Sequence, residues 1–313
     1  MEIGKFQAFI QKIQNSLSKA IVGKEDVIRL VTIAFICDGH VLMEDVPGVG
    51  KTLLVKAFAK ATGMNSKRIQ FTPDLLPSDL TGVNIYNQKT GDFEFHPGPL
   101  FANCVLADEI NRATPRTQSS LLEAMEERQI TVDGLTRKLG RFMVLATQNP
   151  IDSFGTFPLP EAQLDRFFMR IRMGYPKREE EMDIIRRSQD LIRMERVECA
   201  VSEEEIEYVK QNRYSIVVSE DVLGYLMDLI AATRNREHFQ LGVSPRGAIA
   251  LFQASQVSAA LRGRKFVIPE DIAEMAPYIL SHRIILNGAV QSEDIYAPIQ
   301  AILKDVTVPT ENV

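Results

Sequence analysis

The amino-terminal half of the chain alternates short apolar runs with segments of helical periodicity. Apolar runs bounded by turn residues are typical of buried strands, and apolar residues three and four apart are typical of helices. Because strands and helices alternate, we expect an α/β domain whose parallel sheet is covered by helices on both faces. The pattern predicts strands over residues 40–44, 67–71, 102–107, 142–147 and 167–172, and helices over 53–62 and 114–128.

Two segments of this half lack the strand–helix rhythm. Residues 79–99 carry alternating apolar positions on both sides of a turn that contains Gly91, which predicts a β-hairpin. Residues 129–139 predict a second hairpin, because Asp133-Gly134 separates two short strand-like runs. We therefore expect two hairpins inserted into the parallel α/β domain.

Beyond Gly174-Tyr175-Pro176 only helical patterns are visible. Ser202 with Glu205 has the pattern of a capping box, and Ser219 and Ser244-Pro245 begin further helices. Pro269 begins another helix in the same way. We place a domain boundary near Pro176, with an α/β domain over residues 1–176 and an all-helical domain over 177–313.

The first residues are typical of an amphipathic helix and not of a signal peptide, because Phe6, Phe9, Ile13 and Leu17 have helical spacing. No apolar run approaches the length of a membrane span. The cysteines and histidines are scattered without metal-ligand spacing, which argues against a zinc site or a disulfide scaffold and favours the cytoplasm. We expect the three cysteines to be buried and the four histidines to lie at the surface or in turns.

Composition adds two constraints. The chain has 313 residues, of which 45% are hydrophobic and 25% charged, so it is long enough for two globular domains. Its formal net charge is −5, which makes non-specific binding to nucleic acid unfavourable.

The segment Val46-Pro47-Gly48-Val49-Gly50-Lys51-Thr52 has the pattern of a phosphate-binding loop. It follows a predicted strand and begins a predicted helix, which is the context that such a loop requires. Glycines let consecutive backbone N–H groups converge on a phosphate, Lys51 reaches the β- and γ-phosphates, and the Thr52 hydroxyl is a ligand for Mg²⁺. The usual pattern has a glycine where this chain has Asp45.

A pair of acids, Asp108-Glu109, follows the predicted strand that ends near Ala107. Ligands of parallel sheets bind at the carboxyl ends of the strands, so we expect this pair beside the phosphate loop. There Asp108 would hold the Mg²⁺ shell and Glu109 would polarise the attacking water. An enzyme that only passes phosphate to a substrate does not need this second acid.

Together with the phosphate loop, Asp108-Glu109-Ile110-Asn111-Arg112-Ala113 resembles an AAA+ ATPase of the MoxR family. In these proteins Asp45 is a frequent variant. The resemblance covers nearly the whole chain and implies a P-loop NTPase (AAA+) fold, a parallel αβα sandwich with hairpin insertions and a C-terminal all-α lid domain, with ATP and Mg²⁺ as cofactors. Further segments that resemble the family are residues 69–79, 96–100, 146–150, 160–167 and 244–246.

The resemblance also implies roles for single residues. Asn149 resembles the first sensor, an amide that orients water or contacts the γ-phosphate. Arg166 resembles the arginine finger, which acts on the ATP of the neighbouring subunit. Arg246 resembles the second sensor on a lid helix, which would contact the γ-phosphate from the helical domain and so couple the lid angle to the nucleotide state. An arginine placed at a helix N-terminus against the helix dipole itself suggests an anionic partner.

Ile21-Val22-Gly23-Lys24 resembles the linker that packs on the adenine ring, although plain core packing explains these residues nearly as well. The predicted catalytic residues are Lys51, Glu109, Asn149, Arg166 and Arg246, and the predicted metal ligands are Thr52 and Asp108. The predicted nucleotide contacts are Val22, Gly23, Pro47, Gly48, Val49, Gly50, Lys51, Thr52, Leu53 and Arg246.

The resemblance favours an ATPase that forms a ring, commonly a hexamer, and remodels or matures a protein client. A von Willebrand factor A-domain protein is a frequent partner in this family, and metal-cofactor insertion is one version of the task. Two alternatives stay open: a nucleic-acid motor, which Arg137, Lys138 and Arg141 on the second hairpin would serve, and a small-molecule kinase.

Overall fold

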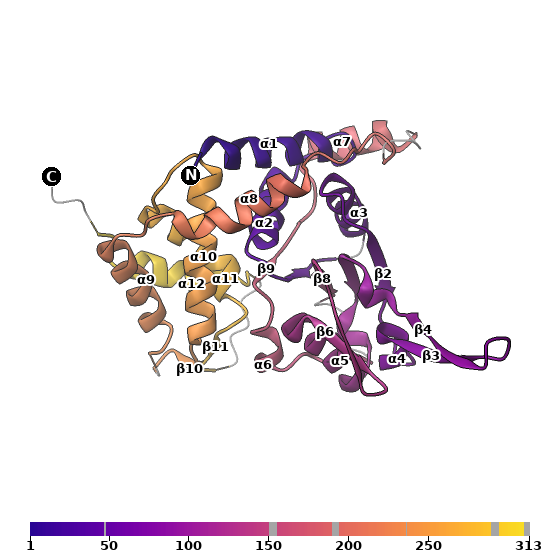
Figure 1. Cartoon of the computed structure of the whole chain (residues 1–313). Helices are drawn as coiled ribbons and strands as arrows, with labels where there is room; N and C mark the ends of the chain where they lie inside the picture. The colour runs from indigo at the N-terminus through magenta and orange to yellow at the C-terminus, as the bar shows by residue number, and fades with distance from the viewer. Residues whose placement is uncertain (47, 150–154, 190–193, 236, 289–293, 310–313) are drawn as a thin grey trace.

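The computed structural model describes residues 1–46, 48–149, 155–189, 194–235, 237–288 and 294–309. Its centre is a five-stranded parallel sheet in the order β2-β5-β8-β1-β9 (Figure 1). The strands of this sheet are β1 Val41–Glu44, β2 Ser66–Gln70, β5 Cys104–Asp108, β8 Met143–Gln148 and β9 Met169–Ile171. The predicted parallel α/β domain is therefore confirmed.

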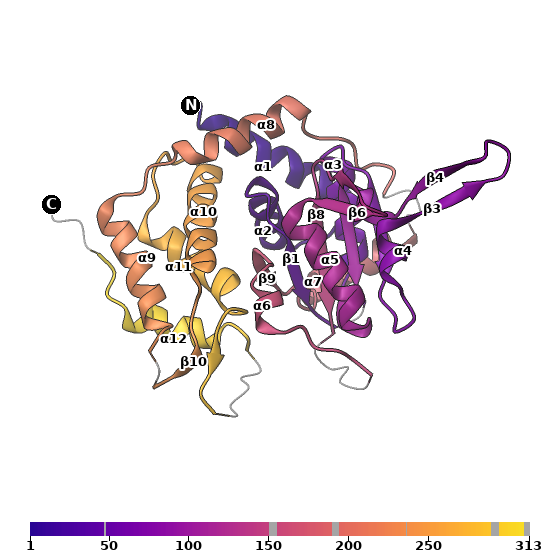
Figure 2. The same cartoon turned by 60° about the horizontal axis from the view of Figure 1, so that its bottom comes forward.

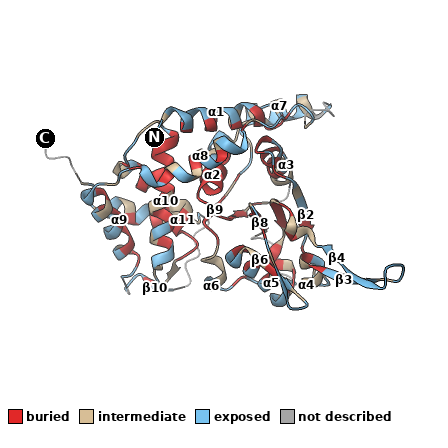
Figure 3. Ribbon diagram, viewed as in Figure 1, coloured by how far each residue is buried: buried red, intermediate tan, exposed pale blue. Residues whose placement is uncertain are grey.

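The sheet has a hydrophobic core on each face, because successive side chains of a strand point to opposite sides. On β1, Val41 and Met43 join the core that contains helices α1 to α3, whereas Leu42 joins the core on the other face. Figure 3 shows buried residues along the sheet and the inner sides of the helices. The helices of the α/β part are α1 Gly4–Leu17, α2 Glu25–Ile36, α3 Lys51–Ala61, α4 Pro77–Thr81, α5 Pro115–Glu127 and α6 Glu161–Leu164, with short 3-10 turns Pro99–Phe101 and Ile110–Arg112.

Both predicted hairpins are present. The first pairs β3 Gly82–Asn87 with β4 Asp92–Pro97, and it projects away from the body of the molecule (Figure 2). The second pairs β6 Gln129–Val132 with β7 Leu135–Lys138.

The predicted helical domain is confirmed, and three of its helices begin where the capping residues indicate. The side chains of Ser202, Ser219 and Ser244 each accept a hydrogen bond from a backbone N–H of the first turn. One addition to the prediction is a small antiparallel pair, β10 Phe239–Leu241 with β11 Ile285–Leu286. The helices are α7 Arg178–Arg186, α8 Glu203–Asn212, α9 Glu220–Ala232, α10 Pro245–Leu261, α11 Pro269–Leu280 and α12 Ala297–Asp305, with 3-10 turns Arg187–Gln189 and Arg213–Ser215.

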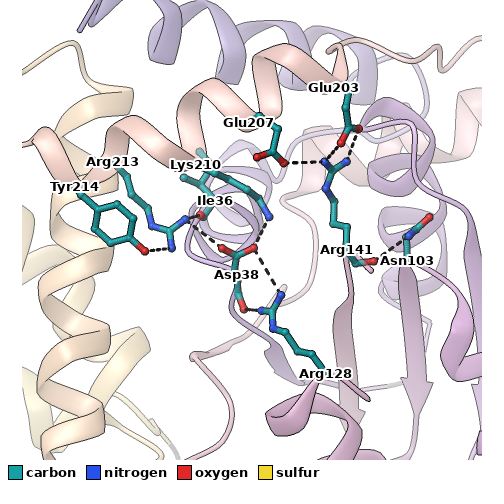
Figure 4. Close-up of polar contacts among 10 residues, drawn as sticks. All are labelled: Ile36, Asp38, Asn103, Arg128, Arg141, Glu203, Glu207, Lys210, Arg213 and Tyr214. Atoms are coloured by element: carbon teal, nitrogen blue, oxygen red, sulfur yellow. Dashed lines mark hydrogen bonds and ion pairs between the residues drawn. The ribbon is translucent and has the colours of Figure 1, made fainter. Parts of the chain in front are cut away.

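Helix α8 packs on the α/β part through a network of charged side chains (Figure 4). The Asp38 carboxylate lies just before β1 and pairs with Lys210 of α8 and, at 3.2 Å, with Arg213. Arg141, just before β8, pairs with Glu203 and, at 3.3 Å, with Glu207 of the same helix. Helix α8 thus contacts the residues that precede two strands of the sheet, although it follows residue 176. The domain boundary near Pro176 therefore stays a prediction.

The expectations for histidines and cysteines were partly wrong. His40 and His282 are buried, because each packs where chain segments distant in sequence meet, and Cys199 is exposed. The neutral His40 ring is fully satisfied: Nε2 donates to the Met125 carbonyl at 3.1 Å, and Nδ1 accepts from the Val144 N–H at 3.0 Å. Burial lowers the pKa of His40 to about 4.

Helices that could span a membrane are not found among the residues that the structure describes.

Candidate nucleotide site

A cavity of about 410 Å³ lies at the carboxyl ends of the strands, next to the turn between β1 and α3. Gly48 and Gly50 adopt positive φ angles of 87° and 94°, a conformation that side chains with a Cβ rarely adopt. They bend the chain so that α3 begins at Lys51 with its N-terminal backbone N–H groups at the cavity. The helix dipole and these donors favour an anion at this place.

Lys51 and Thr52 both line this cavity, as the phosphate-loop pattern predicted. The Lys51 ammonium group donates a hydrogen bond to the Asp45 carbonyl oxygen at 3.0 Å, which holds it across the mouth of the loop. Pro47, another predicted contact, lies outside the described residues.

The two predicted acids lie on the opposite wall of the same cavity. Asp108, the last residue of β5, accepts a hydrogen bond from the Thr147 hydroxyl at 2.6 Å and pairs with Arg68 at 2.6 Å. Glu109 has a left-handed backbone with φ of 57°, and its N–H donates to the Thr147 oxygen at 2.8 Å. This bond stabilises the strained turn that directs the Glu109 side chain into the cavity.

The Glu109 carboxylate has two neighbours. It accepts from the Gln70 amide at 3.1 Å and pairs with Arg112 at 3.0 Å. Sequence reasoning missed Arg68, Gln70 and Thr147 as site residues. The signal that identifies them is the strand order, which the structure supplies: β2 and β8 flank β5, so their carboxyl ends lie beside Asp108.

The residues present fit a magnesium ion. Thr52 and Asp108 supply a hydroxyl and a carboxylate to one cavity, and Mg²⁺ in phosphate-transfer sites is typically held by one or two protein oxygens together with waters and phosphate oxygens. Arg68 pairs with the Asp108 carboxylate, so its guanidinium and a Mg²⁺ ion would compete for the same group.

A second cavity of about 440 Å³ adjoins the first and is mainly apolar. Its wall contains Val22, Val49 and Leu53, three of the predicted nucleotide contacts. The linker at residue 22 therefore faces a space of suitable character for an adenine ring. Gly23 is not among the lining residues; a side chain there would lie 2.5 Å from the Glu180 carboxylate, and its φ of 64° favours glycine.

Asn149, which follows β8, lines the phosphate cavity as the resemblance implies for the first sensor. Arg166 and Arg246 are not among the described residues that line either cavity. Both instead contact one carboxylate of α5: Glu126 pairs with Arg166 at 3.0 Å and with Arg246 at 3.1 Å.

Strand direction explains the position of Arg166. β1 and β9 are parallel neighbours, with Val41 opposite Met169. The phosphate loop follows the last residue of β1, whereas Arg166 precedes the first residue of β9. The two lie at opposite ends of the parallel strands, roughly 13 Å apart along the strand direction. Arg166 therefore lies away from the nucleotide cavity of its own chain, and its guanidinium contacts Glu126 instead.

Asp45, the departure from the usual phosphate-loop pattern, has a structural role. Its buried carboxylate accepts hydrogen bonds from the backbone N–H groups of Met173 at 2.5 Å and Gly174 at 3.0 Å. The Lys24 ammonium group donates to the carbonyl oxygens of the same two residues at 2.8 and 3.1 Å. The phosphate loop is thereby tied to the segment that leaves the sheet towards α7.

Known proteins share this arrangement. Residues 40–169 match the model of the "ATPase family associated with various cellular activities (AAA)", and residues 231–306 match the model of the AAA lid domain. The chain is 38% identical to the chaperone MoxR1 of Mycobacterium tuberculosis, over 95% of this chain and 81% of that protein. The chain belongs to the MoxR family of AAA ATPases.

Other relatives agree with this assignment. The YeaC protein of Bacillus subtilis is 48% identical over 96% of this chain and 95% of its own length. The MoxR protein of Methylorubrum extorquens is 31% identical over 95% and 94%. The crystal structure of a Cytophaga hutchinsonii protein assigned as an ATPase has a TM-score of 0.90 at 38% identity, covering 99% of this chain and 97% of the other. The AAA core and the helical lid are thus shared over nearly the full length.

Proposed function

We propose that this MoxR-family chain hydrolyses ATP with Mg²⁺ at sites that are completed between subunits of a closed ring. The observation that supports the proposal is that the predicted catalytic residues of one chain lie apart. Lys51, Glu109 and Asn149 line the phosphate cavity, whereas Arg166 lies at the opposite end of the parallel strands. A neighbouring subunit that presents this end of its sheet to the cavity would bring the arginine finger to the γ-phosphate.

In this scheme the residues of one chain bind and orient the substrate. The loop glycines and Lys51 bind the phosphates. Glu109 orients the attacking water and accepts a proton from it. Thr52 and Asp108 would hold Mg²⁺, which would offset the negative charge of the phosphate oxygens. Arg166 and Arg246 would come from the next subunit, since both contact Glu126 and neither lines the nucleotide cavities of its own chain.

The cellular task that we propose is remodelling or maturation of a protein client by a hexameric ring. The relative from Mycobacterium tuberculosis is named a chaperone. The projecting hairpin carries Tyr86 and Phe93, which are 52% and 72% exposed and suit contact with an apolar protein surface. A von Willebrand factor A-domain partner and metal-cofactor insertion are specific forms of this proposal.

A nucleic-acid motor is less well supported, because two of the cations that would serve it have protein partners. The Arg137 guanidinium on the second hairpin lies 3.8 Å from the Phe95 ring centroid. Arg141 lies beyond that hairpin, just before β8, and pairs with two glutamates of α8. A kinase is tested simply, since it releases little phosphate without an acceptor.

The decisive experiment measures ATP hydrolysis against protein concentration and in mixed rings. Arg166→Ala and Glu109→Gln should each lower kcat by at least about 100-fold, and mixing them should restore part of the activity. Arg116→Ala on the exposed side of α5 is the matched control and should stay active. Activity per chain that is independent of concentration, with no recovery on mixing, would refute sites between subunits.

A further inference from the structure

Asp165, the residue before the proposed finger, is held by two residues from the helical lid. Its Oδ1 accepts from Arg283 Nε at 2.7 Å, and its Oδ2 accepts from the Ser244 hydroxyl at 3.0 Å. Ser244 is the N-cap of α10, and Arg246 is the second residue of that helix. The lid therefore contacts both oxygens of one carboxylate next to Arg166.

The lid also binds the backbone that follows the finger. Arg283 donates to the carbonyl oxygen of Phe167 at 2.6 Å and to that of Phe168 at 3.2 Å, and it also contacts the carbonyls of Asp165 and Ile279. His282 donates from Nε2 to the Phe167 carbonyl at 3.0 Å. Segment 165–168 is thus held on its backbone and on one side chain by lid residues far away in sequence.

This contact is geometrically strict because it is buried. The Arg283 side chain is 2% exposed. A buried guanidinium is stable only when its donors are paired, so the position of Arg283 fixes the position of the groups it binds. Gly247 in the first turn of α10 permits this approach, since a Cβ there would lie 2.7 Å from Arg283 Cδ.

We infer that Ser244, His282 and Arg283 are positioning residues that make the lid and the arginine finger of one chain move as one unit. Segment 165–168 contacts the lid through Asp165 and Phe167, and Arg166 contacts α5 through Glu126 and, at 2.9 Å, the Leu122 carbonyl oxygen. Because Arg246 of the lid shares Glu126 with Arg166, a rotation of the lid would displace both arginines together; Figures 1 and 2 show α6 between the sheet and the lid helices. Lid position in one subunit would then set how well its two arginines reach the nucleotide of the next subunit. The inference rests on the proposed sites between subunits.

Mixed rings test this coupling between the lid and the arginine finger, which we call the lid–finger coupling. In a mixture of Glu109→Gln and Arg166→Ala chains, the active sites belong to the Arg166→Ala chains and the fingers come from the Glu109→Gln chains. Ser244→Gly is then added to one chain at a time. Glycine is a tolerated N-cap, so the helix is kept while the hydroxyl contact with Asp165 is lost. Ser219→Gly, at the N-cap of α9, is the matched control.

We expect Ser244→Gly to lower the restored activity about tenfold or more when it is in the finger-donating chain, because small displacements of a catalytic group cost up to about 100-fold. The same change in the chain that carries the active site should have little effect, and Ser219→Gly should have little effect in either chain. Asp165→Asn, which removes the charge opposite Arg283, should show the same asymmetry.

Equal losses of activity in both chains, or no loss in either, would overturn the lid–finger coupling, because a general folding defect does not depend on which chain carries it. A loss confined to the chain with the active site would also overturn it. If the parent mixture regains no activity, the sites between subunits are refuted, and so is the lid–finger coupling. That outcome is distinct from a working mixture that lacks the asymmetry.

Discussion

Replacing Asp45 by glycine would restore the usual phosphate-loop pattern, yet the structure predicts that it destabilises the protein. The buried carboxylate accepts two backbone hydrogen bonds from Met173 and Gly174. Hydrogen bonds to charged groups contribute roughly 1.5–3 kcal/mol each, and the cost of burying the charge offsets part of that gain. With the added freedom of glycine in the unfolded chain, we expect a loss of about 2–4 kcal/mol.

Urea unfolding measures this loss. With a slope of about 2–3 kcal/mol per molar urea, the midpoint of Asp45→Gly should fall by about 0.7–2 M. Asp74→Gly changes an exposed turn and serves as the control, with an expected change below about 1 kcal/mol. A midpoint for Asp45→Gly within about 0.2 M of the parent would refute the reasoning, because the two N–H groups would then need no carboxylate.

Three further predictions concern buried or paired groups. Because the pKa of His40 is about 4 in the folded protein and about 6.5 in the unfolded chain, the His40 contribution to the free energy of unfolding should be constant above pH 6.5 and decrease as the pH falls towards 4. About 2 kcal/mol should be lost by pH 5. His40→Asn should make the free energy of unfolding less dependent on pH, as measured by urea titrations at several pH values. Arg68→Ala frees the Asp108 carboxylate, so half-maximal hydrolysis should need about two- to fivefold less Mg²⁺, and an unchanged requirement would contradict the competition. Cys199 should react rapidly with a thiol reagent in the native protein, whereas the other two thiols, whose pKa burial raises to about 12, should react only on unfolding.

The sequence was sufficient for features that depend on neighbouring residues. The phosphate loop was recognised because its glycines, Lys51 and Thr52 stand together between a strand and a helix, and the acids because they end an apolar run. Serine caps and Asp133-Gly134 marked helix starts and a hairpin for the same reason, since capping and tight turns are decided within a few residues.

Contacts between distant segments could not be read in this way. Nothing near Asp45 indicates that its carboxylate binds residues 173 and 174, and nothing near Arg246 indicates that it shares Glu126 with Arg166. The burial of His40 and the β10–β11 pair likewise depend on how separate elements pack.

The sequence by itself determined the identity of the fold and the chemistry of the phosphate cavity, because both are encoded in local motifs and in the alternation of strands and helices. Only the tertiary structure decided which way the two arginines face and what fixes them. The physical reason is that Asp165 and Arg283 are 118 positions apart, and their hydrogen bond exists only because the lid docks against the amino end of β9.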